Sequence, residues 1–344
     1  MTRAIVDIHS HLYPRPYMDL LRARTAIPKI VGDAGDERFV IFPEEDRPDD
    51  SGGRPMGPDY WDIGRKLAFM DSFGIGQTVV SLGNPWLDPF DGPESLTAAR
   101  DLNAELASMR AETTGRIVGM GVLPTDVADA AEVVGEISGT PDLVGVVSGP
   151  RVCGMTLDDD RLGPVWEALE RTGLPWLIHP HYAAAVEELR GFGHAFPVAM
   201  GFPFETTIAV ARLVFAGVIR RHPGMRVIAS HGGGTLPYLA GRLDAGWASD
   251  PSLLERLPDP PSGDLGRLYL DCVLYHQRAM RTAAELVGTG KLSFGTDHPF
   301  SVADPVANLR AIDEAFNGDD RDAVLAGSAR VLFGLDAGMS PAPA

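Results

Sequence analysis

The chain has 344 residues and carries 30 Lys and Arg against 47 Asp and Glu, which gives a formal net charge of −17. Hydrophobic residues make up 44% and charged residues 22%, close to the globular average, which excludes a disordered tail protein, a collagen-like fibre and a coiled coil. Nucleic acids and membrane surfaces bind basic patches, so the strong acidity predicts neither nucleic acid nor membrane as a partner.

The cysteine count and the N-terminal sequence bear on the cellular compartment. Two cysteines, Cys153 and Cys272, cannot form a disulfide framework and lack metal-site spacing. The N-terminus leads into a strand-like segment without a signal-peptide pattern, and no apolar run approaches the ~20 residues that a membrane span needs. We therefore expect a cytoplasmic protein with reduced thiols.

Short apolar runs alternate with longer amphipathic stretches along nearly the whole chain. Most of these runs are continuous Val, Ile and Leu segments, which is typical of parallel strands buried on both faces. Eight strand units favour an α/β fold of the (β/α)8 TIM barrel type over a doubly wound sheet, as a single domain over residues 1–335. In chain order we predict strand 4–9, helix 61–73, strand 76–81, helix 97–113, strand 116–122, helix 127–138, strand 143–148, helix 162–172, strand 175–179, helix 205–222, and strands 226–231, 267–271 and 291–297.

One long connection interrupts this alternation. Residues 21–59 follow the first predicted strand and are rich in Pro, Gly and Asp. A loop of this length inside a compact domain is usually functional or mobile, and in a barrel this loop would lie over the catalytic mouth. We interpret it as a lid, with a surface insertion of no catalytic role as the alternative. Residues 336–344 are expected to form a flexible tail.

Metal-ligand residue types recur at the carboxyl ends of four predicted strands. His9 and His11 are two residues apart on the first strand, so both imidazoles point to the same side. His179, His231 and Asp297 close the fifth, sixth and eighth strands. Barrel enzymes build their active sites at this end of the strands. Each histidine alone could be an ordinary core residue, but the coincidence at four strands predicts a metal site.

The donor set also indicates which ion to expect. Neutral imidazoles and a carboxylate suit a borderline divalent cation, so we expect Zn²⁺, while Fe²⁺, Mn²⁺ and Co²⁺ fit the same donors. A catalytic site keeps one position open, where a metal-activated water ionises near neutral pH.

The arrangement of these residues resembles the amidohydrolase superfamily. Several stretches resemble more specifically the branch that contains 2-amino-3-carboxymuconate-6-semialdehyde decarboxylase, and the similarity runs from about residue 5 to residue 335. These stretches are Phe204-Glu205-Thr206-Thr207, His231-Gly232-Gly233-Gly234-Thr235-Leu236-Pro237, Gly241-Arg242-Leu243-Asp244 and Gly295-Thr296-Asp297-His298-Pro299-Phe300.

The resemblance implies one metal ion, with His231 beside it as the acid/base residue and Asp297 helping to handle protons. Binuclear members of the superfamily bridge two ions with a carboxylated lysine at the end of strand four. The chain has only three lysines and none in residues 143–151, which favours a single ion. The implied ligands are His9, His11, His179 and Asp297.

Two arginines are implied in substrate binding. Arg54 matches the family arginine that binds the substrate carboxylate, although a surface charge paired within the acidic 21–59 segment is the alternative. Arg242 matches an arginine that, in the decarboxylases, reaches the active site of the neighbouring subunit, which implies a homodimer or a larger homo-oligomer. The alternative for Arg242 is an ion pair on the helix surface with Asp244.

Other aromatic and imidazole side chains give weaker signals. Phe196 falls near a lining aromatic of the decarboxylase, so we include it among the substrate contacts. His181 and His298 depart from the family pattern and are further candidates, with supporting or surface roles as the alternative. His194, in a Gly-rich loop, and His222, before a proline, are interpreted as ordinary histidines.

The resemblance favours non-hydrolytic decarboxylation of a small aromatic or unsaturated carboxylic acid. The alternative within enzymes is hydrolysis or hydration of a lactone, an amide or a ring-cleavage product, because the same metal-activated water can attack a carbonyl. A barrel that binds a metal or ligand without turnover is a third reading, but it leaves His231 without a purpose.

Overall fold

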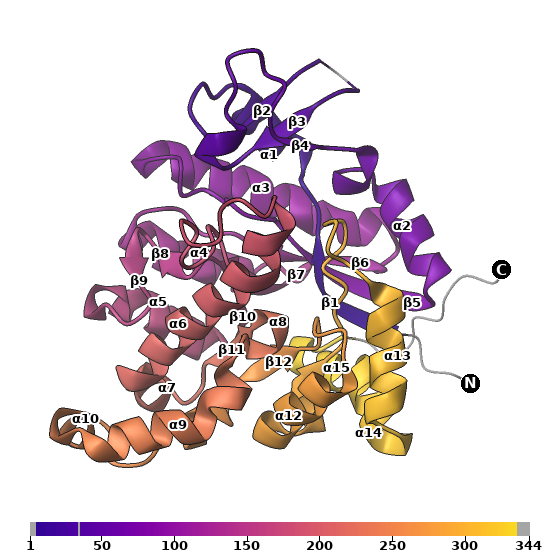
Figure 1. Cartoon of the computed structure of the whole chain (residues 1–344). Coiled ribbons are helices and arrows are strands. Elements are labelled where there is room, and N and C mark those ends of the chain that lie inside the picture. The colour runs from indigo at the N-terminus through magenta and orange to yellow at the C-terminus, as the bar shows by residue number, and fades with distance from the viewer. Residues whose placement is uncertain (1–4, 34, 336–344) are drawn as a thin grey trace.

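The computed structural model describes residues 5–33 and 35–335 of the chain. Its main sheet has eight strands, all paired in parallel, in the order β1-β5-β6-β7-β10-β11-β12-β13, and helices cover the outside of this sheet (Figure 1). The predicted α/β TIM barrel is therefore confirmed. The barrel strands are β1 (Ile5–His11), β5 (Ile75–Ser81), β6 (Ile117–Gly121), β7 (Leu143–Ser148), β10 (Pro175–Ile178), β11 (Arg226–Ala229), β12 (Tyr269–Asp271) and β13 (Leu292–Ser293).

The barrel closes between β1 and the chain that follows β13. The amide of Ile8 donates to the carbonyl of Phe294 at 3.0 Å, and the amide of His11 donates to the carbonyl of His298 at 2.8 Å. The amide of Asp297 donates to the carbonyl of His9 at 2.7 Å. We call these three hydrogen bonds the closing seam, and two predicted metal-binding strand ends meet across it.

The helices form the outer layer of the barrel. The predicted helix 127–138 corresponds to α4, whose first amides are capped by the Asp126 carboxylate. The predicted helix 205–222 is two helices, because Gly217 takes a left-handed φ of 73° that breaks the α-helical path. The helices are α1 (Arg15–Arg22), α2 (Ile63–Ser72), α3 (Gly92–Glu112), α4 (Val127–Ser138), α5 (Gly163–Thr172), α6 (Phe202–Phe215), α7 (Val218–Arg221), α8 (Ser230–Gly233), α9 (Leu236–Ser249), α10 (Pro251–Arg256), α11 (Pro261–Leu265), α12 (Gln277–Val287), α13 (Pro305–Ala315), α14 (Gly318–Asp322) and α15 (Ser328–Phe333).

Alternate residues of the strands pack into two separate hydrophobic clusters, which explains why the strands are apolar on both faces. Val79 and Val80 are neighbours on β5, yet Val79 packs inside the barrel and Val80 packs against the outer helices. The same alternation separates Leu177 from Ile178 on β10. Inside the barrel the strands contribute Val6, Ile8, Val79, Val118, Met120, Val147, Leu177 and Ile228.

The segment 21–59, which we call the insertion, has more regular structure than the sequence indicated. Its strands β2 (Lys29–Val31), β3 (Arg38–Val40) and β4 (Arg54–Pro55) form a small antiparallel sheet above one end of the barrel (Figure 1). A short helix, η1 (Pro43–Glu45), follows β3. Ile30, Phe39 and Met56 are buried and join the same cluster as the barrel interior. The insertion is thus packed onto the barrel, with Arg54 on its last strand.

The expectation that no apolar run reaches membrane-spanning length is wrong for one outer helix. The continuous helical stretch 197–215, made of the π-helical turn η4 (Pro197–Gly201) and α6, is long and apolar enough by length and composition to cross a membrane. In the barrel its Val210, Leu213 and Val214 are buried in the core between the sheet and the helices. These contacts account for its apolar composition without a membrane.

Candidate active site

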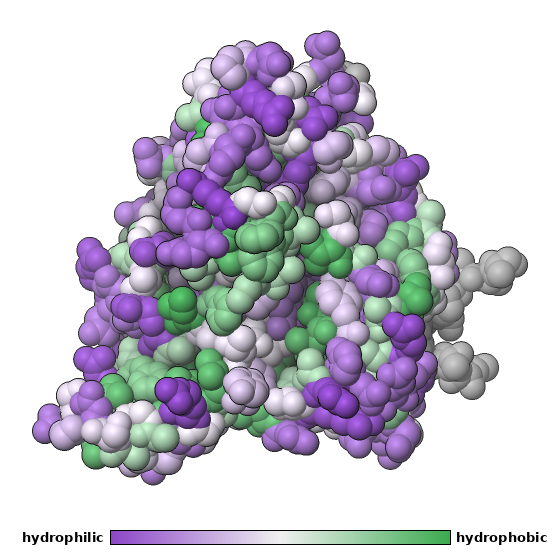
Figure 2. Space-filling view, in the orientation of Figure 1, coloured by the Kyte–Doolittle hydropathy of each residue, from purple (hydrophilic) through white to green (hydrophobic). Residues whose placement is uncertain are grey.

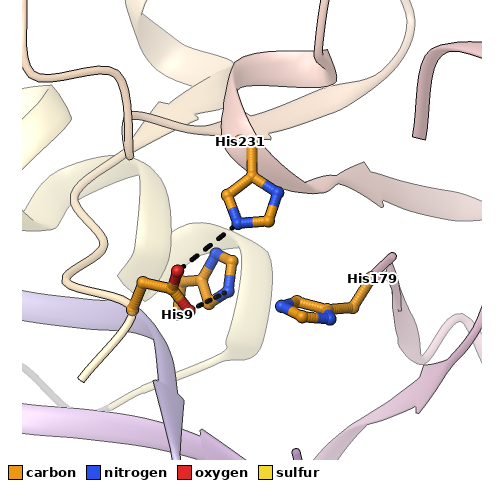
Figure 3. A group of neighbouring side chains, drawn as sticks. His9, His179 and His231 are labelled. Carbon is orange, nitrogen blue, oxygen red and sulfur yellow. Dashed lines mark ion pairs between the residues drawn. The ribbon is translucent and has the colours of Figure 1, made fainter. Parts of the chain in front are cut away.

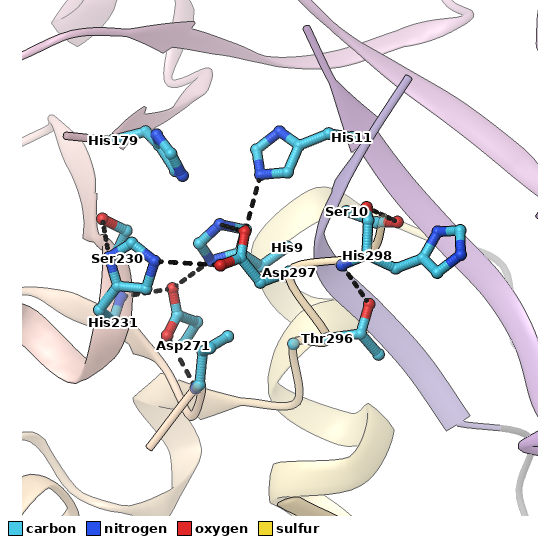
Figure 4. A network of polar contacts seen from close by, with 12 residues as sticks. His9, Ser10, His11, His179, Ser230, His231, Asp271, Thr296, Asp297 and His298 are labelled. Carbon is cyan, nitrogen blue, oxygen red and sulfur yellow. Dashed lines mark hydrogen bonds and ion pairs between the residues drawn. The ribbon is translucent and has the colours of Figure 1, made fainter. Parts of the chain in front are cut away.

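Five polar side chains meet at the carboxyl end of the barrel strands. His9 and His11 come from β1, and His179, His231 and Asp297 come from the turns that follow β10, β11 and β13 (Figure 4). The rings of His9, His11, His179 and His231 lie with neighbouring centroids 4.9–5.4 Å apart. The structure therefore brings together all four implied metal ligands and the implied acid/base residue.

The turns that carry two of these groups have unusual backbone conformations. His231 has a φ of 53° and Asp297 a φ of 60°, both in the left-handed region that non-glycine residues rarely adopt. The carboxylate of Asp271 accepts hydrogen bonds from the amides of His231 at 2.9 Å and Gly232 at 3.1 Å. Such strain persists where the surroundings enforce it, and here it turns both side chains inward over the barrel mouth.

His9, His11 and His179 are each held through the Nδ1 atom, which leaves Nε2 to face the centre. The Nδ1 of His9 lies 2.7 Å from the Asp271 carboxylate, and the Nδ1 of His11 lies 3.1 Å from the hydroxyl of Ser81. The Nδ1 of His179 lies 2.9 Å from the following backbone carbonyl. A carbonyl only accepts, so the proton of His179 lies on Nδ1 and Nε2 keeps its lone pair. Partners of this kind orient the imidazole ligands of metal sites.

Burial and the neighbouring charged groups together shift the pKa values of the side chains in the cluster. Burial and the neighbouring histidines lower the pKa of His179 well below its ordinary value, so this ring is neutral. Burial alone would lower the pKa of His9, but the carboxylates of Asp271 and Asp297 outweigh it and raise that pKa to about 10. Burial would raise the pKa of Asp297, but the surrounding imidazoles hold it well below its ordinary value, so this group is a carboxylate.

These donors fit a divalent metal ion. One ligand atom each from His9, His179, His231 and Asp297 can be chosen so that all four lie within 4.8 Å of one another (Figure 3). The Nε2 atom of His179 is buried and has no hydrogen-bond partner within the described part of the chain, and the buried Nε2 of His9 faces the Asp297 carboxylate at 3.3 Å. His11 Nε2 is 3.2 Å from Asp297 Oδ1, so it borders the same space. Buried unpartnered nitrogens are costly unless an ion or proton satisfies them.

A buried lysine lies behind the cluster. Lys66, on α2, is fully buried, and its ammonium lies 2.8 Å from the Ser10 hydroxyl and 2.6 Å from His298 Nδ1. It also donates to the carbonyl of His298 at 3.3 Å, so it bridges both sides of the closing seam. Burial lowers the pKa of Lys66 from 10.5 to about 7, and burial raises the pKa of the nearby Asp7 to about 6.

Replacing Lys66 with methionine is expected to change how stability depends on pH. In the unfolded chain Lys66 keeps its proton up to its ordinary pKa of 10.5, whereas in the folded chain the proton leaves near pH 7. Between these values the unfolded state binds more protons, so this lysine makes the free energy of unfolding rise with pH. Lys66→Met should remove that rise. Urea denaturation of the metal-stripped wild type and the metal-stripped variant between pH 7 and pH 10 measures the free energy of unfolding of each.

The matched control for this prediction is Lys291→Met. Lys291 is half-buried, and its ammonium donates to the carbonyl of Gly266 at 2.8 Å. If the difference in unfolding free energy between wild type and Lys66→Met stays constant over this pH range, the expected role of Lys66 is contradicted.

A cavity opens beside the cluster, between the insertion and the turns after β10 and β13. It includes Arg54 from β4 together with His179 and Asp297 of the cluster. The Nε atom of Arg54 is buried and has no hydrogen-bond partner among the described residues. The guanidinium therefore has unused donors next to the candidate metal centre. The cavity is lined by Arg54, Asn84, His179, His194, Val198, Phe202, Asp297, Phe300, Ser301 and Val302.

Four other candidates lie away from this cavity. Phe196 packs against Phe192 with ring centroids 5.3 Å apart, and Phe192 is 74% exposed. Arg242 is exposed on α9. The remaining two are His181, which is buried beside Trp86 and 3.4 Å from the Asp88 carboxylate, and His298, which stacks on Phe69 and points away from the cluster (Figure 4).

Sequence reasoning missed several residues that the structure places in or around the site, among them Asp271, Asn84 and His194. Asp271 holds His9 and the His231 turn, and its position as the last residue of the seventh strand was a usable signal. Asn84 and His194 line the cavity from loops. His194 was interpreted as ordinary because a glycine-rich loop gives no indication of where its side chains point.

Comparisons with known proteins agree with this geometry. Residues 6–335 match the amidohydrolase family. The chain belongs to the amidohydrolase family. The resemblance inferred from the strand-end residues is therefore confirmed, and the relatives below support the decarboxylase-like branch.

Three individual relatives show which members of the family this chain is similar to. A 2-amino-3-carboxymuconate-6-semialdehyde decarboxylase of Dictyostelium discoideum is 29% identical over 267 residues, covering 75% of this chain and 72% of the relative. The crystal structure of a Metarhizium anisopliae IDCase in apo form has a TM-score of 0.90 and 31% identity, covering 96% of this chain and 97% of that one. A dihydroxybenzoic acid decarboxylase from Polaromonas sp. JS666, with bound manganese and the inhibitor 2-nitroresorcinol, shares the fold at 21% identity, a TM-score of 0.75 and coverage of 96% and 97%.

Proposed function

We propose that this amidohydrolase is a metal-dependent, non-hydrolytic decarboxylase of a small aromatic or unsaturated carboxylic acid. One observation carries the proposal: Arg54 lines the same cavity as His179 and Asp297 of the cluster. The Nε atom of Arg54 is buried and has no hydrogen-bond partner among the described residues. A carboxylate is the ligand that an arginine fork binds best, and the named relatives are decarboxylases.

The residues divide the work of such a reaction. Arg54 would bind and orient the substrate carboxylate, and His231, whose Nε2 is 3.5 Å from Asp297 Oδ2, would deliver a proton to the ring carbon that bears it. The carbon–carbon bond to the carboxylate then breaks, its electron pair returns to the ring, and CO2 leaves. His231 regains its proton from water, so one proton is consumed for each CO2 released. A bound divalent metal would supply a Lewis acid and activate water at the cluster.

We propose Zn²⁺ as the native ion, held by His9, His11, His179 and Asp297. Three neutral imidazoles and one carboxylate are typical of zinc, but manganese is bound in the Polaromonas relative. Elemental analysis of the protein as purified, followed by chelation and reloading with each ion, tests this choice. Activity restored by Mn²⁺ and not by Zn²⁺ would contradict it.

The proposed reaction is tested by CO2 release. The metal-loaded protein is incubated with a panel of ortho-hydroxylated benzoic acids and unsaturated acids, and CO2 and the decarboxylated product are measured together. Stoichiometric release of both is expected for at least one acid. Hydrolysis of a lactone or an amide without any CO2 would instead support the hydrolase alternative.

Replacing Arg54 with lysine is expected to weaken substrate binding more than it slows the chemical step. Lysine keeps the charge but loses the planar fork that matches a carboxylate, and a lost charge-assisted hydrogen bond costs ~1.5–3 kcal/mol. KM should rise about 10-fold to 100-fold with a smaller change in kcat. Arg38→Lys is the matched control, because Arg38 donates to the carbonyls of Gly52 and Gly53 within the insertion and does not line the cavity. An unchanged KM for Arg54→Lys would contradict a role in binding the carboxylate.

A homodimer or larger assembly also remains a proposal, with Arg242 acting across its interface. Arg242 is exposed on α9, one turn after Tyr238, which is 84% exposed; on α6, Ile208 is 54% exposed. Apolar side chains gather on this face over the beginning of α6 (Figure 2). Light scattering of the wild type should give a multiple of 36.8 kDa. A monomer that is fully active would contradict the proposal.

A further inference from the structure

We propose that Glu205 is a positioning residue for the metal centre, which acts on the ligand candidate His179 through the peptide group between Pro180 and His181. This inference rests on the proposed function, because it takes His179 as a ligand of the ion. It assigns a role to a carboxylate on α6 that neither the proposed ligand set nor the proposed proton transfer uses, and that does not line the cavity.

Three consecutive backbone amides converge on one carboxylate oxygen of Glu205. Its Oε2 accepts hydrogen bonds from the amides of His181 at 2.7 Å, Tyr182 at 3.1 Å and Ala183 at 3.1 Å. Ala183 has a left-handed φ of 68°, which non-glycine residues rarely adopt. Successive amides in a turn of this kind form a concave site that binds an anion. The Glu205 carboxylate therefore fills an anion-binding turn in the loop that follows β10.

One of these amides belongs to the peptide group that holds His179. The carbonyl of Pro180 accepts a hydrogen bond from Nδ1 of His179 at 2.9 Å, and the amide of His181 is part of the same planar peptide unit. The N–H and the C=O of a trans peptide unit point in opposite directions, so this unit has Glu205 on one side and the imidazole on the other. The carboxylate, the peptide unit and the ring form one continuous hydrogen-bonded chain, which we call the Glu205 chain.

The Glu205 chain ends at the free nitrogen of His179. This Nε2 atom is buried and has no hydrogen-bond partner among the described residues, and the ring points toward His9 (Figure 3). Hydrogen bonds in a chain polarise one another, so the anion makes the Pro180 carbonyl a stronger acceptor. A strong acceptor at Nδ1 fixes the tautomer and the ring orientation and raises the basicity of the other nitrogen. Glu205 should therefore strengthen Nε2 as a ligand without touching the ion.

The histidine at the start of the cluster shows the same principle in a shorter form. Nδ1 of His9 lies 2.7 Å from the carboxylate of Asp271, so a charge stands directly behind that ring. Nδ1 of His179 meets a neutral carbonyl instead, and Glu205 places a carboxylate one peptide unit further back. Burial raises the pKa of Glu205, and the three amides act against this shift by stabilising the ionised form.

Zn²⁺ affinity, measured by competition with a chelator on metal-stripped protein, tests the inference. Glu205→Gln keeps an oxygen acceptor for the three amides but removes the charge, and it should weaken Zn²⁺ binding about 10-fold. Glu205→Ala also removes the acceptor and should weaken it about 100-fold. Glu170→Gln is the matched control, because Glu170 accepts the amide of Gly224 at 3.1 Å on the outer layer of the barrel. This control should bind Zn²⁺ as tightly as wild type.

A double-variant cycle separates an effect on His179 from a general loosening of the loop. If the charge acts through His179, Glu205→Gln should cause no further loss of Zn²⁺ affinity once His179→Gln is present. In the His11→Gln background the same substitution should still cost about 10-fold. A loosened loop would instead give the same loss in both backgrounds. The unfolding of each metal-stripped protein in urea records any purely structural contribution separately.

The outcomes decide the inference separately from the reaction. Glu205→Gln that binds Zn²⁺ as tightly as wild type overturns it, and so does an equal loss in both backgrounds. If His179→Gln binds Zn²⁺ too weakly to measure, the Co²⁺ absorption spectrum of Glu205→Gln carries the test: shifted bands support the inference and unchanged bands overturn it. Wild type without Zn²⁺ affinity contradicts the metal centre and the inference together. Weaker binding in Glu205→Gln, without CO2 release by wild type, supports the inference and contradicts the decarboxylation.

Discussion

Asp297→Asn is expected to lower kcat by at least about 1,000-fold, because it should remove the metal ion. A bound metal ion supplies several kcal/mol of transition-state stabilisation. Asp297 is the negative charge at the centre of the cluster: its Oδ1 lies 3.2 Å from His11 Nε2 and 3.3 Å from His9 Nε2. Asparagine has nearly the same shape but removes the charge that offsets the dication. Metal content by mass spectrometry should therefore fall together with activity.

Asp304→Asn is the matched control for this substitution. Asp304 follows on the same connection and caps α13 through the amide of Ala307, without contributing to the cavity. It should cost the ~1 kcal/mol typical of a lost helix cap and leave the metal content unchanged. If Asp297→Asn keeps a full complement of metal and normal turnover, the proposed ligand set is wrong.

His231→Gln is expected to slow CO2 release by about 100-fold to 10,000-fold, the range typical of a lost general acid. The left-handed turn at φ 53° and the Asp271 carboxylate aim the His231 ring at Asp297 from the side opposite to β1. Glutamine keeps a hydrogen-bonding group there but cannot transfer a proton. Metal content and substrate KM should change little, whereas kcat falls.

The same substitution separates the two roles that the geometry allows for His231. One ring nitrogen of His231 lies close enough to those of His9 and His179 to bind the ion as well. Metal lost from His231→Gln but retained in His11→Gln would assign His231 to the ligand set and His11 to a supporting role. Metal lost only from His11→Gln would agree with the ligands implied by the resemblance.

Much of the fold and the polar cluster followed from the sequence, because strand burial and strand ends have local signatures. The apolar runs that predicted β5 and β7 correspond to strands within one residue of the expected bounds. His9, His11 and His179 could be placed together because parallel strands in a barrel present their carboxyl ends on one face. That rule needs no knowledge of the loops.

The substrate-facing residues could not be predicted in the same way, because loop conformation decides them. His298 follows Asp297 directly, yet its ring turns outward onto Phe69 and Lys66. Conversely, His194 comes from a loop without periodicity and lines the cavity through a contact with Glu45, about 150 residues away. Such pairings depend on how the insertion packs, which neither composition nor spacing records.

The closing seam has a consequence for the order in which this protein matures during synthesis. The hydrogen-bonded pair His11 and Asp297 is separated by 286 residues, and the amide of Asp297 bonds to the backbone of His9. Ribosomes add ~5–20 residues each second, so the last ligand emerges many seconds after the first. A nascent chain stalled before β13 therefore contains the three proposed histidine ligands without their carboxylate. We therefore expect metal acquisition to be a late event, coupled to the final closure of the barrel.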